Sequence, residues 1–157
     1  RMADDLGTRT SEFIARLTEA LGPKGVSTDP VEIDPHISDW RGRWKGSTPV
    51  LVKPATTEEV SKAMTLCAEY GFAVNPQGGN SGMVNGSVPQ GEVLISLKRM
   101  NKVREVDTLN DAMTLEARET ADALVQQHGF LEDDSTLDSF PEDVAAFFHR
   151  IAEAANR

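Results

Sequence analysis

Hydrophobic residues recur at helical spacing near the start of the chain. The recurring positions are Phe13, Ile14, Leu17 and Leu21. Because they lie three or four residues apart, they share one face of a helix. Gly22-Pro23 follows directly and is typical of a helix end. The pattern therefore predicts a helix over residues 10–21 with one buried face.

A strand, a helix and a second strand are predicted between residues 49 and 75. The apolar run 49–53, closed by Pro54, predicts one buried strand, and residues 72–75 predict the other. Thr56 and Glu59 have capping-box spacing, and Gly71 suits a left-handed helix end. The helix between them is predicted to bury Val60, Ala63, Met64, Cys67 and Tyr70. This order is a βαβ unit, which predicts a parallel pair of strands with a right-handed crossover.

The second half of the chain returns to extended segments and then to helices. Residues 92–97, 102–107 and 112–117 alternate with short polar connections, which predicts an antiparallel β-meander. Two amphipathic helices are predicted after it, over residues 118–128 and from Pro141 onward. The predicted fold class is α+β: an N-terminal helix, a βαβ unit, the meander and C-terminal helices.

The size and charge of the chain restrict its class. It has 157 residues, of which 39% are hydrophobic, and a net charge of −9. That length fits one domain, and the acidic balance argues against binding to nucleic acid or to an anionic membrane. No apolar run approaches a membrane span, and the single cysteine, Cys67, excludes an internal disulfide. We therefore expect a soluble cytoplasmic protein.

The negative charge is concentrated at the C-terminal end. Residues 1–117 carry 13 basic and 16 acidic groups, whereas residues 118–157 carry 3 basic and 9 acidic groups. Most of the excess negative charge thus lies in the last quarter of the chain. This shift predicts a boundary near Ala117, with an acidic helical tail over residues 118–157.

A glycine-rich segment directly follows the predicted βαβ unit. Its sequence, PQGGNSGMVNGSVP over residues 76–89, places four glycines within nine residues. Glycine permits positive φ angles and close approach of a ligand, and successive amides in such a turn can form an anion-binding nest. The segment lacks the GK[ST] ending of a nucleotide-triphosphate loop and does not follow GxGxxG. The glycine pattern alone is equally compatible with a plain flexible loop.

Longer stretches of sequence resemble one family. They are WRGRWKG (40–46), VLVKPATTEEVSKAMTLCAEYGFAVNPQGGNSGMVNGSVP (50–89) and LKRMNKVREVDTLNDAMTLEA (97–117). In this order they resemble the flavin-binding domain of bacterial D-2-hydroxyacid dehydrogenases. These include the D-2-hydroxyglutarate, D-lactate and glycolate dehydrogenase flavoproteins of the p-cresol methylhydroxylase and vanillyl-alcohol oxidase superfamily. The resemblance covers roughly residues 20–117.

The resemblance implies a set of FAD contacts. Residues 77–83 are expected to wrap the FAD pyrophosphate, mainly through backbone amides, and Pro54 is expected to close the first strand beside the cofactor. The implied contacts are Pro54, Pro76, Gln77, Gly78, Gly79, Asn80, Ser81, Gly82, Met83, Ser87 and Val88. Related flavoproteins with a GGH loop bond the histidine covalently to the flavin. Because Asn80 holds that position here, we expect non-covalent FAD.

The chain departs from the family pattern after residue 117. Arg118 stands where the family has a glycine, and neither a second glycine-rich segment nor the substrate domain follows. A fragment, a disrupted reading frame and a truncated protein all fit this pattern. The complete enzyme is expected to oxidise a D-2-hydroxyacid to a 2-oxo acid by hydride transfer to flavin N5. We expect weak or no activity from the isolated chain, and we assign it no catalytic residue and no metal site.

An alternative hypothesis is a non-catalytic remnant or interaction module. It would associate with a partner, or with a second copy as a homo-oligomer, through the acidic tail and through apolar surface that the missing half would cover. Other candidate groups have simpler interpretations. The three histidines, His36 among them, are expected at the surface or at helix ends, and Cys67 as a small buried side chain. Trp40 and Trp44 are expected to pack on the core; the alternative is that their basic neighbours approach an anionic ligand.

Overall fold

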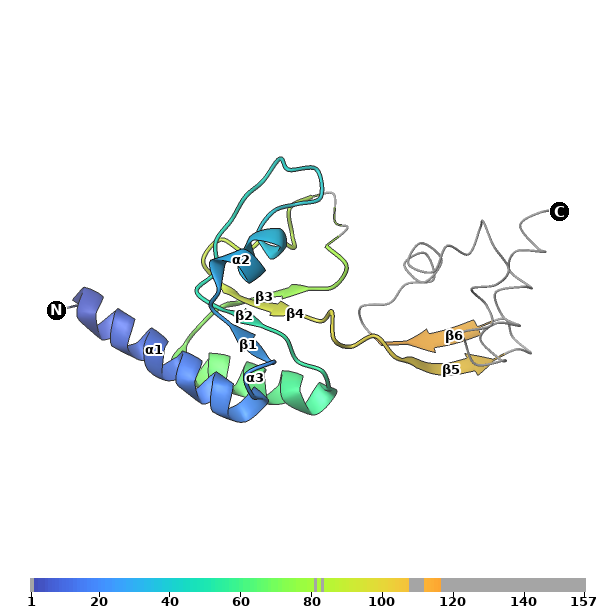
Figure 1. The fold of residues 1–157 in the computed structure, drawn as a ribbon, viewed down its shortest axis with the longest axis horizontal. Coiled ribbons are helices and arrows are strands. Elements are labelled where there is room, and N and C mark those ends of the chain that lie inside the picture. Colours follow the sequence, from blue (N-terminus) through green and yellow to red (C-terminus); the bar gives the residue numbers. More distant parts are fainter. Residues whose placement is uncertain (1, 81, 83, 108–111, 117–157) are drawn as a thin grey trace. The chain divides into compact units, whose positions relative to one another are not determined.

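The chain folds into two compact units, Arg1–Met100 and Asn101–Arg157, which are described separately. The computed structural model describes residues 2–80, 82, 84–107 and 112–116. The first unit contains a four-stranded sheet with helices against both faces, and the second contains a two-stranded sheet (Figure 1). The fold class is therefore α+β, as predicted.

Helix α1, Met2–Leu21, buries the face that the sequence pattern predicts. Phe13 and Leu17 are fully buried, and the helix ends where the amide of Gly22, at a φ of 73°, donates to the carbonyl of Thr18. The helix begins eight residues earlier than predicted. Once the packed turns of the helix have formed, extending it is easier than starting it, because each further residue that becomes helical adds one backbone hydrogen bond. A helix can therefore extend beyond its apolar stripe.

The sheet of the first unit has the strand order β1-β2-β4-β3. Strand β1, Val26–Ser27, pairs antiparallel with β2, Leu51–Val52. Strand β4, Val93–Ser96, pairs in parallel with β2 on one side and with β3, Val74–Gln77, on the other. The parallel strands are thus present, but β2 and β3 are not neighbours.

This strand order corrects the sequence prediction for residues 92–97. They were expected to begin the antiparallel meander, whereas they form the central parallel strand β4. All four residues of β4 are at most 2% exposed. A strand covered on both faces is typical of a parallel sheet, while a meander strand commonly leaves one face in water. The unbroken apolar run Val93-Leu94-Ile95 is consistent with this placement but does not decide it.

Helix α3, Thr57–Tyr70, has the caps predicted for it. The Thr56 hydroxyl accepts a hydrogen bond from the amide of Glu59, and Gly71 ends the helix at a φ of 66°. The Glu59 carboxylate accepts from the amide of Ala55, whereas a capping box would use the amide of the capping residue, Thr56. Its buried face differs from the prediction: Leu66 is buried, whereas Met64 is 46% exposed, and Val60 and Tyr70 are half-buried. Since successive residues turn by about 100°, Met64 points away from the face that Ala63 centres.

Hydrophobic side chains alternate between the two faces of the sheet. Val50 and Val52 point toward α1 and α3, as do Val93 and Ile95 of β4. Leu51 and Leu94 point to the other face, where they pack with Ile33 of the short helix α2, Pro30–Ile33. A single-turn 3-10 helix, Asp34–His36, follows α2 directly. The short strands are therefore held by packing on both sides.

The second unit contains the antiparallel pair that the sequence predicts. Strand β5, Val103–Asp107, pairs with β6, Ala112–Leu115, with a register shift between Val103 and Glu105. Arg104 and Glu116 form an ion pair of 3.3 Å at its end. The predicted helices over residues 118–157, and the boundary at Ala117, lie outside the described residues and stay predictions. In the part of the chain that is described, no helix has the length and apolar character of a membrane span.

Candidate functional site

The predicted FAD contacts lie at the carboxyl ends of the parallel strands. Gln77 ends β3 and is in register with Ser96, the last residue of β4, while Pro54 follows two residues after β2. The segment that begins with Gln77, residues 77–90, is called the glycine loop. Ligands of parallel α/β sheets commonly bind at this edge. The sheet therefore brings Pro54 and the glycine loop to the same edge.

The side chain of Gln77 is buried and fully hydrogen-bonded within the protein. Its Nε2 donates to the carbonyl oxygens of His36 at 2.8 Å and Ser87 at 2.9 Å. Because that nitrogen is used twice as a donor, Oε1 must accept, and His36 Nδ1 donates to it at 2.7 Å. Gln77 is 1% exposed. Its side chain thus joins three separate segments, and it leaves little to offer a ligand except its backbone.

His36 is buried rather than at the surface, which corrects the sequence expectation. It lies at the end of the 3-10 helix with 8% of its surface exposed. Burial lowers the pKa of His36, and the hydrogen bond to Gln77 opposes that shift. A neutral imidazole with its hydrogen on Nδ1 satisfies the Gln77 contact. Among the described residues, no three potential ligands gather as a metal site would require.

Asn80 and Ser87 close the glycine loop on itself. Asn80 has a φ of 56°, and its Nδ2 donates to the carbonyl of Ser38 at 2.9 Å. Its Oδ1 accepts from the Ser87 hydroxyl at 2.7 Å. Both polar ends of the Asn80 side chain therefore have protein partners. The left-handed backbone at Asn80 suits asparagine better than most residues other than glycine.

The glycine loop retains backbone donors without protein partners. The amides of Gly78 and Gly79 form no hydrogen bond with any other described residue. Three buried polar side-chain atoms are also unpaired: Asn75 Oδ1, Asn85 Oδ1 and Ser96 Oγ. Asn75 lies in β3, Asn85 lies in the glycine loop, and Ser96 of β4 is in register with Gln77. Unpaired buried polar groups are uncommon, and no described residue supplies a partner to any of these three atoms. A polar ligand at this edge fits those groups.

The remaining predicted contacts differ in exposure. Val88 is buried at 3%, whereas Pro76 and Gly82 are exposed. A Cβ added to Gly82 would lie 3.8 Å from the Ser87 hydroxyl, an ordinary contact distance. Ser81 and Met83 lie outside the described residues. The structure thus brings Gln77, Asn80 and Ser87 together through direct hydrogen bonds.

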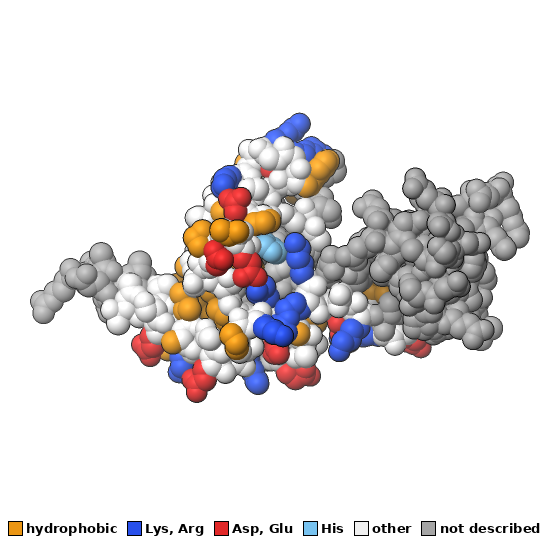
Figure 2. Space-filling model, viewed as in Figure 1, with side chains coloured by type: hydrophobic (Ala, Val, Ile, Leu, Met, Phe, Trp, Pro, Cys, Tyr) orange, Lys and Arg blue, Asp and Glu red, His pale blue; other side chains and the backbone are white. Residues whose placement is uncertain are grey.

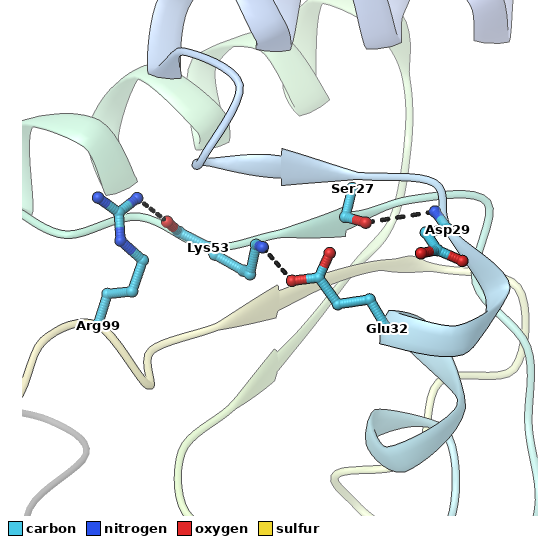
Figure 3. Close-up of polar contacts among 5 residues, drawn as sticks. All are labelled: Ser27, Asp29, Glu32, Lys53 and Arg99. Atoms are coloured by element: carbon cyan, nitrogen blue, oxygen red, sulfur yellow. Dashed lines mark hydrogen bonds and ion pairs between the residues drawn. The ribbon is translucent and has the colours of Figure 1, made fainter.

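The position of Pro54 is fixed by polar contacts on both sides of it. Arg99 donates to the carbonyl of Lys53 at 2.7 Å, and Glu59 accepts from the amide of Ala55 at 2.8 Å. Lys53 is also ion-paired with Glu32 (Figure 3). That hydrogen bond from Lys53 is the main cause that lowers the pKa of Glu32. This cluster joins α2 to the residues that follow β2 and β4.

A second loop, residues 38–46, lies against the glycine loop and is called the tryptophan loop. The Asp39 carboxylate accepts hydrogen bonds from the amides of Arg41, Arg43 and Trp44. These bonds, with that from Trp44 the largest cause, lower the pKa of Asp39. Trp40 is 61% and Trp44 40% exposed, so the expectation that both tryptophans pack on the core is wrong. Asp39 is buried instead, because its carboxylate oxygens accept hydrogen bonds from the amides of the loop.

Cys67 is a buried structural side chain, as the sequence predicts. It is 1% exposed within the core between α1, α3 and the sheet. Burial raises the pKa of its thiol to about 11. The thiol is therefore neutral at physiological pH and is not a nucleophile.

Comparison with known proteins places this chain in one family. The sequence model described as FAD binding domain matches residues 48–131. Among curated relatives, D-2-hydroxyglutarate dehydrogenase of Bos taurus is 39% identical over 117 residues, and that of Danio rerio is 41% identical over 99 residues. These alignments cover 72% and 62% of this chain but only 22% and 19% of the relatives. The chain thus spans about a fifth of their length.

Solved structures show the same fold. Alkyldihydroxyacetonephosphate synthase has a TM-score of 0.63 at 25% identity, over 76% of this chain and 27% of that one. The 4-ethylphenol oxidase of Gulosibacter chungangensis has a TM-score of 0.64 at 23% identity, over 78% of this chain and 25% of that one. The family resemblance inferred from the sequence is confirmed. The match to residue 131 runs past Ala117, and the predicted boundary there stays a prediction.

Sequence reasoning missed several residues of this site. His36 and Asp39 have no motif that identifies their roles, since the partner of His36 is distant in sequence and those of Asp39 are backbone amides. Ser96 has no motif either, and its hydroxyl is unpaired among the described residues. His36 lies 41 residues from Gln77 along the chain. For Asp39, the one available signal was an acidic residue directly before a short turn containing glycine, a common arrangement for side-chain bonds to loop amides.

Proposed function

We propose, on the premise that this chain belongs to the FAD binding domain family, that its glycine loop holds the pyrophosphate of a non-covalently bound FAD. The observation that carries the proposal is that the amides of Gly78 and Gly79 have no partner among the described residues, in a loop that the Gln77 and Asn80 side chains brace. Each hydrogen bond to a charged phosphate contributes roughly 1.5–3 kcal/mol. Local donors of this kind offset the unfavourable net charge of −9.

The roles of the proposed contacts then divide by chemistry. Gln77, Asn80 and Ser87 hold the loop through their side chains and remain proposed contacts, although the carbonyls of Gln77 and Ser87 already accept hydrogen bonds within the protein. The unpaired oxygens of Asn75 and Asn85 are acceptors, and they fit the hydroxyl groups of a dinucleotide. Pro54, Pro76, Gly78–Met83 and Val88 remain proposed contacts. The Asn80 side chain amide is engaged and cannot replace a histidine that attaches flavin covalently, which supports non-covalent binding.

The reaction we propose belongs to a complete enzyme of which this chain is one part. FAD would supply an isoalloxazine ring as the hydride acceptor, and a base of the complete enzyme would take the hydroxyl proton, so that a D-2-hydroxyacid would become a 2-oxo acid. D-2-hydroxyglutarate, D-lactate and glycolate are the candidate substrates, and the names of the curated relatives support the first. This chain contributes binding and orientation of the cofactor. We expect it to show weak or no dehydrogenase activity by itself.

FAD titration of the purified 157-residue chain tests the proposal. We expect saturable quenching of flavin fluorescence and release of FAD on denaturation. Gly79→Pro removes one amide donor and is expected to weaken FAD binding at least about tenfold. Gly79→Ala keeps the amide donor and is expected to change the affinity for FAD little. Far-UV circular dichroism checks that both variants fold. A wild-type chain that neither contains nor binds FAD contradicts the proposal.

The alternative function, a non-catalytic interaction module, rests mainly on residues 118–157, which lie outside the described residues. In the described part, Val31 and Val84 are 81% and 85% exposed, which supports association with another surface. A homo-oligomer is the simplest form of this alternative. Light scattering that finds a monomer at all concentrations, together with FAD binding, would decide against it.

We also propose that the protein acts in the cytoplasm. The neutral thiol of Cys67, the single cysteine, is compatible with a reducing compartment. The curated relatives named above carry the word mitochondrial in their names. Cell fractionation followed by detection of this chain tests the proposal, and recovery in an organelle fraction contradicts it.

A further inference from the structure

The tryptophan loop is fastened to the glycine loop at both of its ends. At its start, the Ser38 carbonyl accepts from Asn80 Nδ2 at 2.9 Å. At its end, the amide of Ser47 donates to the Pro89 carbonyl at 2.9 Å, and Gly46 packs so closely there that a Cβ would lie 1.8 Å from the Pro89 oxygen. The two loops therefore form one continuous structure, and a ligand on the glycine loop lies beside the base of the tryptophan loop.

This loop concentrates positive charge in an acidic protein. It carries Arg41, Arg43 and Lys45 against a single acidic residue, Asp39, whose oxygens are occupied by loop amides. Lys45 is paired with Asp34 at 2.7 Å. Arg41 and Arg43 have no carboxylate within ion-pair distance among the described residues. Two guanidinium groups thus remain available to an anion.

The same loop exposes its aromatic rings. Trp40 and Trp44 are exposed at 61% and 40%, and the Arg41 guanidinium lies 4.7 Å from the centre of the Trp40 ring. Figure 2 shows basic and hydrophobic side chains gathered at the top of the view, over the segment between α2 and β2. Exposed tryptophan beside unpaired arginine offers a stacking surface and a phosphate-binding group together.

We propose that the tryptophan loop is a second arm of the FAD site, which contacts the adenosine diphosphate part of the cofactor. Arg41 and Arg43 supply charge to the phosphates, and the tryptophan rings supply a surface on which the adenine stacks. This proposal rests on the proposed FAD function. Complementary charge favours it, since the ligand carries two negative phosphates and the loop carries two unpaired arginines. The backbone donors of the glycine loop and the side chains of the tryptophan loop then act on the same ligand.

Intrinsic fluorescence provides a direct test, because the chain has two tryptophans and both lie in this loop. ADP, which has the phosphates and adenine but no flavin, is expected to change tryptophan emission in a saturable way. FAD is expected to do so at lower concentration. Riboflavin, which lacks phosphates and adenine, serves as the negative probe and is expected to leave the emission almost unchanged.

Arginine variants separate this role from a merely structural one. Arg41→Ala with Arg43→Ala is expected to raise the Kd for FAD about tenfold, with less effect at high salt. Arg41→Lys with Arg43→Lys keeps the charge and is expected to recover part of the affinity. Lys24→Ala with Lys62→Ala removes the same charge from exposed sites outside both loops and is the matched control.

The outcomes distinguish the two proposals. If the wild-type chain binds FAD but the arginine pair and ADP have no effect, the tryptophan loop is not part of the site and the inference is overturned, while the FAD proposal stands. If the wild-type chain does not bind FAD, both proposals are overturned. A tryptophan emission that responds only to protein concentration identifies the loop as a docking surface instead, which also overturns the inference.

Discussion

The two loops at this edge of the sheet are held in opposite ways. In the glycine loop, the side-chain amides of Gln77 and Asn80 bond to carbonyl oxygens, and the N–H groups of Gly78 and Gly79 have no acceptor among the described residues. In the tryptophan loop, the Asp39 carboxylate takes up N–H groups and leaves the side chains exposed. One loop therefore offers its backbone and the other its side chains, although both are fixed by buried polar groups.

The largest effect on this arrangement is expected from Gly46→Ala. A Cβ at that position would collide with the Pro89 carbonyl, so the two loops would have to separate. We expect the free energy of unfolding to fall by about 3 kcal/mol, measured by chemical denaturation. Gly7→Ala is the matched control, because it lies in open space within α1 and is expected to stabilise the protein by about 0.5–1 kcal/mol. Equal stability of Gly46→Ala and wild type would show that the close contact is not real.

Gln77→Leu should have the next largest effect and acts on the glycine loop. It leaves the carbonyls of His36 and Ser87 and the His36 Nδ1 group buried without a partner. We expect a loss of about 2–3 kcal/mol in the free energy of unfolding, and weaker FAD binding because the free amides are no longer held in place. Gln90→Ala, at an exposed position of the same loop, is expected to change stability by less than about 0.5 kcal/mol. A Gln77→Leu protein with wild-type FAD affinity contradicts this positioning role.

The smallest effect is expected from acid and is confined to the tryptophan loop. Because hydrogen bonds from the amides of Trp44, Arg43 and Arg41 lower the pKa of Asp39 in the folded state, its stabilising contribution is present above the ordinary carboxyl pKa of about 4. That contribution is lost as pH falls through the lower pKa of the folded state. Tryptophan emission followed between about pH 5 and pH 2 should report this change. Asp39→Asn is expected to abolish the transition, and an unchanged acid profile in that variant rules out Asp39 as its source.

Local features of the fold were predictable because neighbouring residues decide them. The caps of α3 at Thr56 and Gly71 follow from residue types within one helical turn of each end. The glycine loop was recognisable from its composition and from the family resemblance. The position of β4 was not, because Val93-Leu94-Ile95 fits either an antiparallel or a parallel strand until its two covered faces are known.

The site residues divide in the same way. Residues 77–83 were identified as the pyrophosphate segment from sequence, and that role remains a prediction. The use of the Gln77 side chain was not predictable, because its partner His36 is 41 residues away. The exposure of Trp40 and Trp44 ran against the usual burial of aromatic residues. The tryptophans are exposed because the loop folds around Asp39, whose carboxylate accepts hydrogen bonds from the loop amides. A hydrophobicity pattern does not predict such hydrogen bonds.

The amino-acid sequence by itself determined the packed face of α1, helix α3 with its caps, the location of the glycine-rich segment and the family, because these depend on short-range patterns and on residue identity. Only the tertiary structure decided that β4 lies between β2 and β3, that Gln77 and Asn80 bond inward, and that no described residue accepts a hydrogen bond from the amides of Gly78 and Gly79. The physical reason is that every buried polar group must find a partner, and in this protein those partners come from segments far apart in the chain.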